Sequence, residues 1–339
     1  MLNRFKWRFL LLAFAAVSLL AGLWAGAARL GLDLPALNEE LPSNHGPMMV
    51  VGFLGTLIAL ERAVALDRLW PYGAALLSGF SVLTVLFGFP PEFGAALALG
   101  ASCLSIMVFV SLYRLAPATH FIVMILSAVL WAMGNALWLM TQPFNVAAPW
   151  WVGFLVLMIA GERLQLSRVM QRPARASWLF NASVAVFLIG LAISLAAFDA
   201  GIRVAGAALL ALALWLFRYD IAGRTVRERG LTRYMAVCLL CGYFWLAAAG
   251  MLWITFADDF VAGPKYDAML HAVFLGFVFS MIFAHAPVIF PSITGLALPF
   301  RRGFYLHLAL LHGALLLRVG GDLVSSTALQ QWGGVGNIA

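Results

Sequence analysis

Two histidines lie within one long apolar stretch of the sequence, residues 267–297. About 20 apolar residues suffice to cross a bilayer, and this stretch is longer than that while carrying His271 and His285. An imidazole in hydrocarbon is costly unless it binds a metal or is hydrogen-bonded, so both side chains need partners. At about 100° per residue, His285 falls within about 40° of the helix face of His271. The sequence therefore predicts one histidine near each membrane surface, on one side of the helix.

The composition is that of a membrane protein. Of the 339 residues, 64% are hydrophobic and 10% are charged, and the mean hydropathy is +0.97. A soluble core does not need so much apolar surface. We expect an all-α, polytopic bundle of eleven or twelve transmembrane helices, with residues 1–339 forming a single transmembrane domain.

Apolar windows place eleven membrane-spanning helices along the chain. Their breaks contain Pro or Gly, as at Pro90-Pro91 and Gly263-Pro264. The first apolar stretch is longer than the ~7–15 residue core of a signal peptide, which favours a retained helix. The expected spans are residues 7–29, 46–67, 70–89, 93–115, 119–141, 148–170, 177–198, 202–219, 234–256, 266–292 and 303–321.

The positive charges indicate an orientation. With a cytoplasmic N-terminus and alternating spans, all 21 Lys and Arg fall on the inner side except Arg29, Arg203, Lys265 and Arg318. This asymmetry follows the positive-inside rule. The net charge of +7 is thus explained by topology, and no nucleic-acid partner is expected.

The C-terminus reads as an interrupted element. Residues 330–334 are expected to form an outer turn and residues 335–339 the first residues of another helix. We interpret this as a twelfth span that is missing from the sequence. An odd number of spans with an outer C-terminus is the alternative.

One pattern occurs three times, beginning at Gly52, Gly153 and Gly276 and ending nine residues later at Glu61, Glu162 and His285. The copies are centred on residues 45–67, 148–170 and 266–292, four helices apart. Apolar helices resemble each other easily, so chance is an alternative, but the regular spacing argues against it. A true repeat predicts three arcs of four helices around a pseudo-threefold axis.

The outer ends of two copies carry candidate haem ligands. His45 lies seven residues before Gly52, and His271 lies five before Gly276, so their depths differ by about 3 Å on equivalent helices. Two histidines at one depth on non-adjacent spans suit the axial positions of a haem, and Gly46 and Gly52 would let the macrocycle approach. The alternative is two hydrogen-bonded histidines at helix ends.

The remaining histidines are expected in the inner half of the membrane. His285, His307 and His120 are candidates for a second metal site there. Glu61 and Glu162 each precede an arginine, so a structural ion pair or a side chain that reaches the membrane surface is the expected role. No hydrolase motif, zinc motif or phosphate-binding glycine loop is present in the sequence, so hydrolytic and nucleotide-driven activities are unsupported.

Three segments resemble the NnrS family: the residues from His45 to Leu54, those from His271 to Gly276, and those from Leu315 to Asp322. That family consists of bacterial inner-membrane proteins of about twelve helices, associated with haem, copper and nitric oxide metabolism. The resemblance implies a missing last helix, haem b and less directly copper, and a role in nitrosative stress. The NnrS pattern often opens with two histidines where this chain has only His45, which weakens the case for a second outer metal.

The arrangement is also similar to the catalytic subunit of haem-copper oxidases and nitric oxide reductases, in which helices 2 and 10 supply the two ligands of a low-spin haem. His45 and His271 match these positions. The histidines that this superfamily places on helices 6 and 7 are absent from the corresponding spans here. The similarity thus implies a low-spin haem without the binuclear centre of those enzymes.

Three functions remain open at this stage. The first is an NnrS-like haem protein of the bacterial inner membrane, acting by electron transfer or gas sensing, with membrane lipid, nitric oxide or an electron-transfer protein as partners. The second is a transporter or channel in which His285, Glu61 and Glu162 form a proton or ion path. The third is a scaffold subunit without a cofactor.

Overall fold

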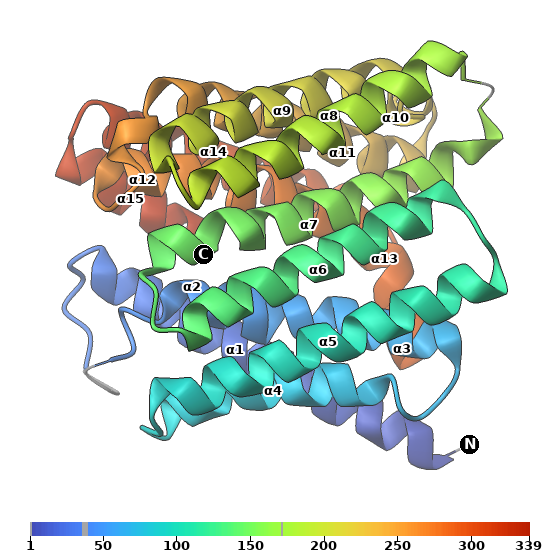
Figure 1. The fold of residues 1–339 in the computed structure, drawn as a ribbon, viewed down its shortest axis with the longest axis horizontal. Coiled ribbons are helices and arrows are strands. Elements are labelled where there is room, and N and C mark those ends of the chain that lie inside the picture. Colours follow the sequence, from blue (N-terminus) through green and yellow to red (C-terminus); the bar gives the residue numbers. More distant parts are fainter. Residues whose placement is uncertain (1, 36–39, 171) are drawn as a thin grey trace. The chain divides into compact units, whose positions relative to one another are not determined.

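The structure is a computed structural model that describes residues 2–35, 40–170 and 172–339. Over these residues the chain is all-α, as Figure 1 shows. Its elements, with η for 3-10 and π segments, are α1 (Leu2–Arg29), α2 (His45–Pro47), η1 (Met48–Gly55), α3 (Thr56–Leu66), α4 (Tyr72–Leu86), α5 (Pro91–Leu115), α6 (Thr119–Leu139), α7 (Phe144–Leu166), η2 (Ser167–Val169), α8 (Ala174–Ser194), α9 (Phe198–Tyr219), α10 (Ala222–Thr225), α11 (Gly230–Thr255), η3 (Ala257–Asp259), α12 (Pro264–His271), η4 (Ala272–Phe279), α13 (Ser280–Thr294), α14 (Phe304–Leu323) and α15 (Thr327–Ile338).

The expected membrane spans are confirmed as helices. Ten helical stretches in the described ranges are long and apolar enough to cross a membrane. The expected span at 70–89 is the shorter helix α4, which has 15 residues. The protein is therefore a multi-pass membrane protein, as the composition predicted.

The helix boundaries follow the turn chemistry of the sequence. Pro91 occupies the first turn of α5, where its missing N–H costs no hydrogen bond. Gly263 has a φ of 96°, which favours glycine, and directly precedes Pro264 at the start of α12. The expected breaks at these two positions are confirmed.

The C-terminal segment differs from expectation. Residues 330–334, predicted as an outer turn, lie inside α15, because the turn comes earlier, at Ser325 with a φ of 55°. Asn337 donates a hydrogen bond from Nδ2 to the carbonyl oxygen of Leu311 at 3.3 Å, so α15 runs back along α14.

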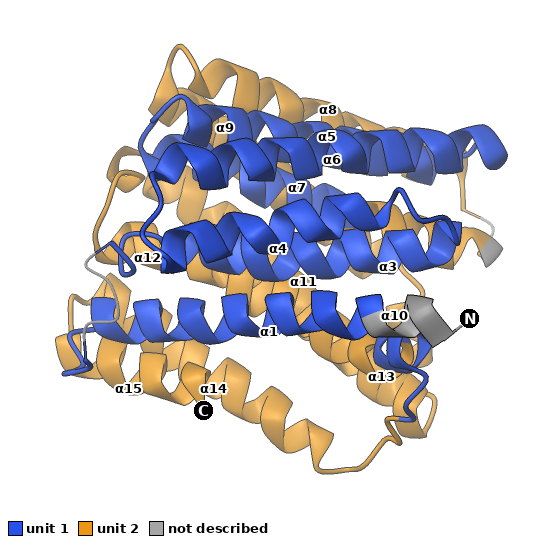
Figure 2. Cartoon of the chain, turned by 90° about the horizontal axis from the view of Figure 1, so that it is seen from below, with its two compact units in different colours: residues 1–158, 289–297 blue, residues 159–288, 298–339 orange. Residues whose placement is uncertain are grey.

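The chain divides into two compact units, coloured separately in Figure 2. Unit 1 comprises residues 1–158 and 289–297, and unit 2 comprises residues 159–288 and 298–339. In unit 1, α4, α5 and α6 pack side by side, and Trp151 donates a buried hydrogen bond to Asn135 at 3.0 Å. In unit 2, α9 packs against both α8 and α11. The expectation of a single transmembrane domain stays a prediction.

Two π-helical segments interrupt the spans that contain the first and third copies of the repeat. They are η1 (Met48–Gly55) and η4 (Ala272–Phe279), each eight residues long. Gly52 is the fifth residue of η1, and Gly276 is the fifth residue of η4. The two segments therefore coincide residue for residue in the register that the sequence repeat predicted.

The ends of the two segments also correspond. A residue with a hydroxyl group follows each segment: Thr56 follows η1 and Ser280 follows η4. The backbone N–H of Thr56 donates to the carbonyl of Phe53, and that of Ser280 donates to the carbonyl of Phe277. The middle copy differs, because it lies in the continuous α-helix α7. The shared π-helical geometry supports the interpretation of the first and third copies as repeats.

The π-segment η4 affects which helix face His285 presents. His271 directly precedes η4, and His285 lies beyond it. The expected angle of about 40° between them assumed an uninterrupted α-helical period, and the π-segment changes that period. The expectation that these two histidines share a helix face stays a prediction.

Candidate functional site

His45 begins α2 and contacts α1 in unit 1. Its Nδ1 lies 2.7 Å from the carbonyl oxygen of Gly22. Because a carbonyl only accepts, Nδ1 carries the proton and the lone pair is on Nε2. Gly26, one helical turn further along α1, gives the ring room, since a Cβ there would lie 3.0 Å from its Cε1. The pair of glycines on α1 thus holds this imidazole in one orientation and one tautomer.

His271 ends α12 in unit 2 and has the same tautomer. Its Nδ1 donates to the carbonyl oxygen of Asp267 at 2.7 Å, one turn earlier on the same helix. The Asp267 carboxylate in turn lies 3.7 Å from a guanidinium nitrogen of Arg318 on α14. The lone pair of His271 is again on Nε2.

Both histidines satisfy what an axial haem ligand requires of its protein. Such a ligand is a neutral imidazole whose second nitrogen donates to an acceptor, which fixes the ring and raises its basicity. His45 and His271 are both partly buried and both donate from Nδ1 to a backbone carbonyl. The residues present therefore fit the group that the sequence predicted.

The glycines expected beside the macrocycle behave differently from each other. A Cβ at Gly52 would lie 2.2 Å from Val82 and 2.7 Å from the hydroxyl of Ser18, so protein side chains already fill that space. A Cβ at Gly46 would meet nothing within 4 Å. The expectation that Gly52 makes room for haem is wrong, because α1 and α4 pack there.

The three histidines predicted to form an inner metal site have different environments. His120 is 7% exposed and packs against the ring of Phe121 at 4.3 Å. His307 is exposed, and His285 is partly buried. In the part of the chain that the structure describes, no three His, Cys, Asp or Glu side chains form a group that could hold a metal ion. The metal site stays a prediction.

A buried ion pair lies at the C-terminal end of α7 in unit 2. Nε and Nη2 of Arg163 donate to the two carboxylate oxygens of Asp220 at 3.0 and 2.9 Å. The Arg163 side chain is 4% exposed and that of Asp220 is 0% exposed. Two-point contact and burial make this a strong pair whose disruption would leave a bare charge.

His285 joins this pair. Its Nδ1 donates to the Met281 carbonyl at 2.7 Å, so Nε2 is the acceptor that lies 3.5 Å from Nη1 of Arg163. Arg163 from α7, Asp220 after α9 and His285 from α13 thus form one polar cluster. The buried Tyr243 side chain of α11 lies close enough to interact electrostatically with the Arg163–Asp220 pair, but its hydroxyl makes no hydrogen bond within the described residues.

Arg172 borders the cluster outside the membrane spans. It donates to the hydroxyl of Ser167 and stacks over the ring of Trp215, 5.0 Å from its centroid. Burial lowers the pKa of Arg172, and the nearby Asp220 carboxylate partly offsets that effect.

The two glutamates that precede an arginine differ. In unit 1, Glu61 forms the expected ion pair with Arg62 at 3.2 Å. In unit 2, the carboxylate that pairs with Arg163 is that of Asp220.

His312 connects α11 and α14 to the π-segment η4. Trp245 donates from Nε1 to its Nδ1 at 3.0 Å, so Nε2 carries the proton and lies 3.5 Å from the hydroxyl oxygen of Ser280. That hydroxyl donates to the Gly276 carbonyl at 2.5 Å. Trp245 also packs on Gly276, since a Cβ there would lie 2.4 Å from its side chain. The four residues form a closed set of contacts beyond His271.

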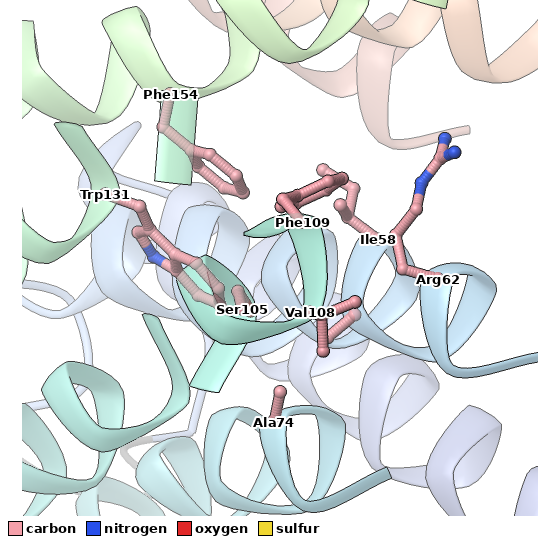
Figure 3. Close-up of a pocket in the computed structure, with 9 residues that line it drawn as sticks. Ile58, Arg62, Ala74, Ser105, Val108, Phe109, Trp131 and Phe154 are labelled. Atoms are coloured by element: carbon pink, nitrogen blue, oxygen red, sulfur yellow. The ribbon is translucent and has the colours of Figure 1, made fainter. Parts of the chain in front are cut away.

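Unit 1 contains a small, mostly apolar cavity about the size of one water molecule. Figure 3 shows Trp131, Phe109 and Phe154 around it, with the Arg62 guanidinium turned away from these rings. It is far too small for a haem.

Sequence reasoning missed Asp220 and both partners of His312. Asp220 and Arg163 are 57 residues apart, and Trp245 and His312 are 67 apart, so no local pattern joins them. One general rule could have indicated the pair: an arginine within a membrane span needs a counter-ion, so acidic residues at the ends of other spans are candidates.

The fold and these polar clusters define an integral membrane protein built from many helices. The chain belongs to a family described as a domain of unknown function, DUF8744, whose model matches residues 8–339. No curated protein and no solved structure matches the chain.

Proposed function

We propose that this protein is a membrane haem protein in which His45 and His271 are the axial ligands. The observation that carries the proposal is the common tautomer of the two histidines. Each donates from Nδ1 to a backbone carbonyl at 2.7 Å, which directs the lone pair to Nε2, the nitrogen that would bind iron. A haem held by two histidines supplies one-electron transfer.

The positions of the two histidines support the same proposal. One begins the helix that leads into η1 and the other directly precedes η4, at matching ends of two repeat copies. π-segments occur frequently at functional sites, because they re-aim side chains and free backbone carbonyls.

The resemblance to the NnrS family suggests a role for the haem in nitric oxide metabolism or nitrosative stress. A six-coordinate haem has no open position for a substrate while both ligands remain bound. The proposed activity is therefore electron transfer or gas sensing, and the cellular location is the bacterial inner membrane.

Visible absorption of the detergent-purified protein tests this function. We expect the oxidised and reduced spectra of a low-spin haem b after expression with sufficient haem. The His45→Ala and His271→Ala variants should each lose the haem or convert it to high spin, whereas the control His307→Ala, at an exposed position, should keep the wild-type spectrum. A colourless wild-type protein would contradict the proposal.

A proton- or ion-coupled transporter is the second candidate, favoured by the buried cluster of Arg163, Asp220 and His285. Ionisable side chains within membrane spans commonly lie on ion paths, and here Nε2 of His285 faces a buried ion pair. The test is proton flux into liposomes that contain the purified protein, under an imposed membrane potential. A transporter predicts flux that His285→Gln abolishes, in a protein without colour.

A further inference from the structure

One end of unit 2 carries a set of exposed arginines. They lie in the last turn of α9, in α10, between α10 and α11, and in the first turns of α8 and α11, and all are exposed. The set, here called the arginine surface, consists of Arg175, Arg218, Arg224, Arg227, Arg229 and Arg233. Among the described residues from Arg218 to Arg233, Glu228 is the one exposed carboxylate.

Contacts within unit 2 bring these segments together. Trp215 near the end of α9 donates from Nε1 to the carbonyl of Ala176 in α8 at 2.7 Å, which places Arg175 beside the end of α9. The helix α10 contacts both α9 and α11. Figure 1 shows α10 at the same end of the helices as the connection between α7 and α8. The arginines therefore lie on one surface although they come from separate loops.

The turn that carries three of them is held rigidly. Asp220, at its start, is paired with the buried Arg163 and also accepts a hydrogen bond from the backbone N–H of Ala222 at 2.8 Å. Backbone hydrogen bonds then continue through the turn, from Val226 to Ala222 and from Arg227 to Arg224. Because this backbone is already ordered, the turn loses little further backbone entropy when its arginines bind a ligand.

At the opposite end of unit 2, three basic side chains lie close to carboxylates of the chain. Arg203 pairs with Asp258 at 2.5 Å, Lys265 pairs with Asp259 at 2.9 Å, and Arg318 lies 3.7 Å from Asp267. Within the described residues, none of the six guanidinium groups of the arginine surface has a carboxylate partner. Arg218 lies over the Tyr219 ring, 5.2 Å from its centroid, and all six exposed charges are accessible to a partner outside the chain.

We propose that the arginine surface binds the headgroups of anionic phospholipids. A guanidinium group presents a planar pair of donors that matches phosphate oxygens, and it stays charged at any physiological pH. The arginines lie at helix ends, where membrane spans meet the headgroup layer, and the exposed Trp178 on α8 adds an aromatic side chain typical of that layer. The charge complementarity selects anionic over zwitterionic lipid.

Spin-labelled lipids test the proposal on the full chain. The protein is reconstituted in phosphatidylcholine, and electron paramagnetic resonance measures how strongly it restricts spin-labelled phosphatidylglycerol relative to spin-labelled phosphatidylcholine. The wild type should prefer phosphatidylglycerol by roughly three- to tenfold, and the R224Q/R227Q/R229Q variant should lose most of that preference. The matched control, R203Q/K265Q, removes charges at the paired end and should leave the preference unchanged.

Two further measurements on the wild type keep the test independent of variant folding. Raising NaCl to about 0.5 M should weaken the preference by screening. Millimolar inorganic phosphate should not abolish it, because the proposed partner is the lipid surface and not a free anion. Equal affinity for the two lipids, an undiminished preference in the triple variant, or loss of the preference to inorganic phosphate would each overturn the proposal.

Discussion

Gly52 and Gly276 occupy the same position, the fifth, of two eight-residue π-segments in different units of the chain. Each is a point of close packing: Val82 and Ser18 lie where a Cβ of Gly52 would be, and Trp245 lies where a Cβ of Gly276 would be. Because π-segments are rare, their coincidence in one register is strong evidence for a repeat. Both segments follow closely after a histidine whose tautomer is fixed.

Substitution of Gly276 tests this packing. The Gly276→Ala variant should lose about 1–3 kcal/mol of stability, because its methyl group would overlap the Trp245 side chain. Gly313→Ala is the matched control, since a Cβ at Gly313 of α14 meets nothing within 4 Å. The control should be neutral or gain up to about 1 kcal/mol from helix propensity. Unfolding in detergent, followed by circular dichroism, measures both; equal stability of the two variants would contradict the packing.

Breaking the buried ion pair should be costly. Asp220→Asn leaves the Arg163 guanidinium buried without a counter-ion, so we expect a loss of about 3–5 kcal/mol. Asp258→Asn breaks the exposed pair with Arg203 and should cost within about 1 kcal/mol. The same unfolding measurement compares them. If Asp220→Asn is as mild as Asp258→Asn, the pair does not hold α7 to the end of α9.

The bond between Trp245 and His312 can be measured by a double-mutant cycle. Trp245→Phe and His312→Phe each remove one partner of the 3.0 Å bond, and the double variant removes both. We expect a coupling energy of roughly 0.5–1.5 kcal/mol, because each single variant leaves a buried polar group without its partner. Additive single-variant effects would show that the Trp245–His312 contact contributes no interaction energy of its own.

Hydropathy predicted the helices well, and the reason is physical. A bilayer requires about 20 apolar residues per span with every backbone group bonded within the helix, so composition and length determine the fold class. Proline and glycine located the breaks at Pro91 and Gly263 because their backbone preferences act locally. In the described residues, the departures from expectation were the short helix α4, the earlier start of α15 and the two π-segments η1 and η4.

The polar contacts could not be predicted in the same way. The acceptors of His45 and His271 are backbone carbonyls, which every residue has, so the sequence does not identify them. The π-segments consist of apolar residues and glycine, so no polar residue in them shows that the helical period changes there. The ion pair of Arg163 and Asp220 depends on tertiary packing between spans that the sequence separates.

Magnetic circular dichroism of the oxidised, detergent-purified protein, from the visible to the near infrared, tests the central claim most directly, because it identifies the two axial ligands of a low-spin haem. We predict the spectrum of a haem with two imidazole ligands, lost in both His45→Ala and His271→Ala and retained in His307→Ala. A protein without haem after haem-replete expression, or a haem spectrum that both substitutions leave unchanged, would contradict the account.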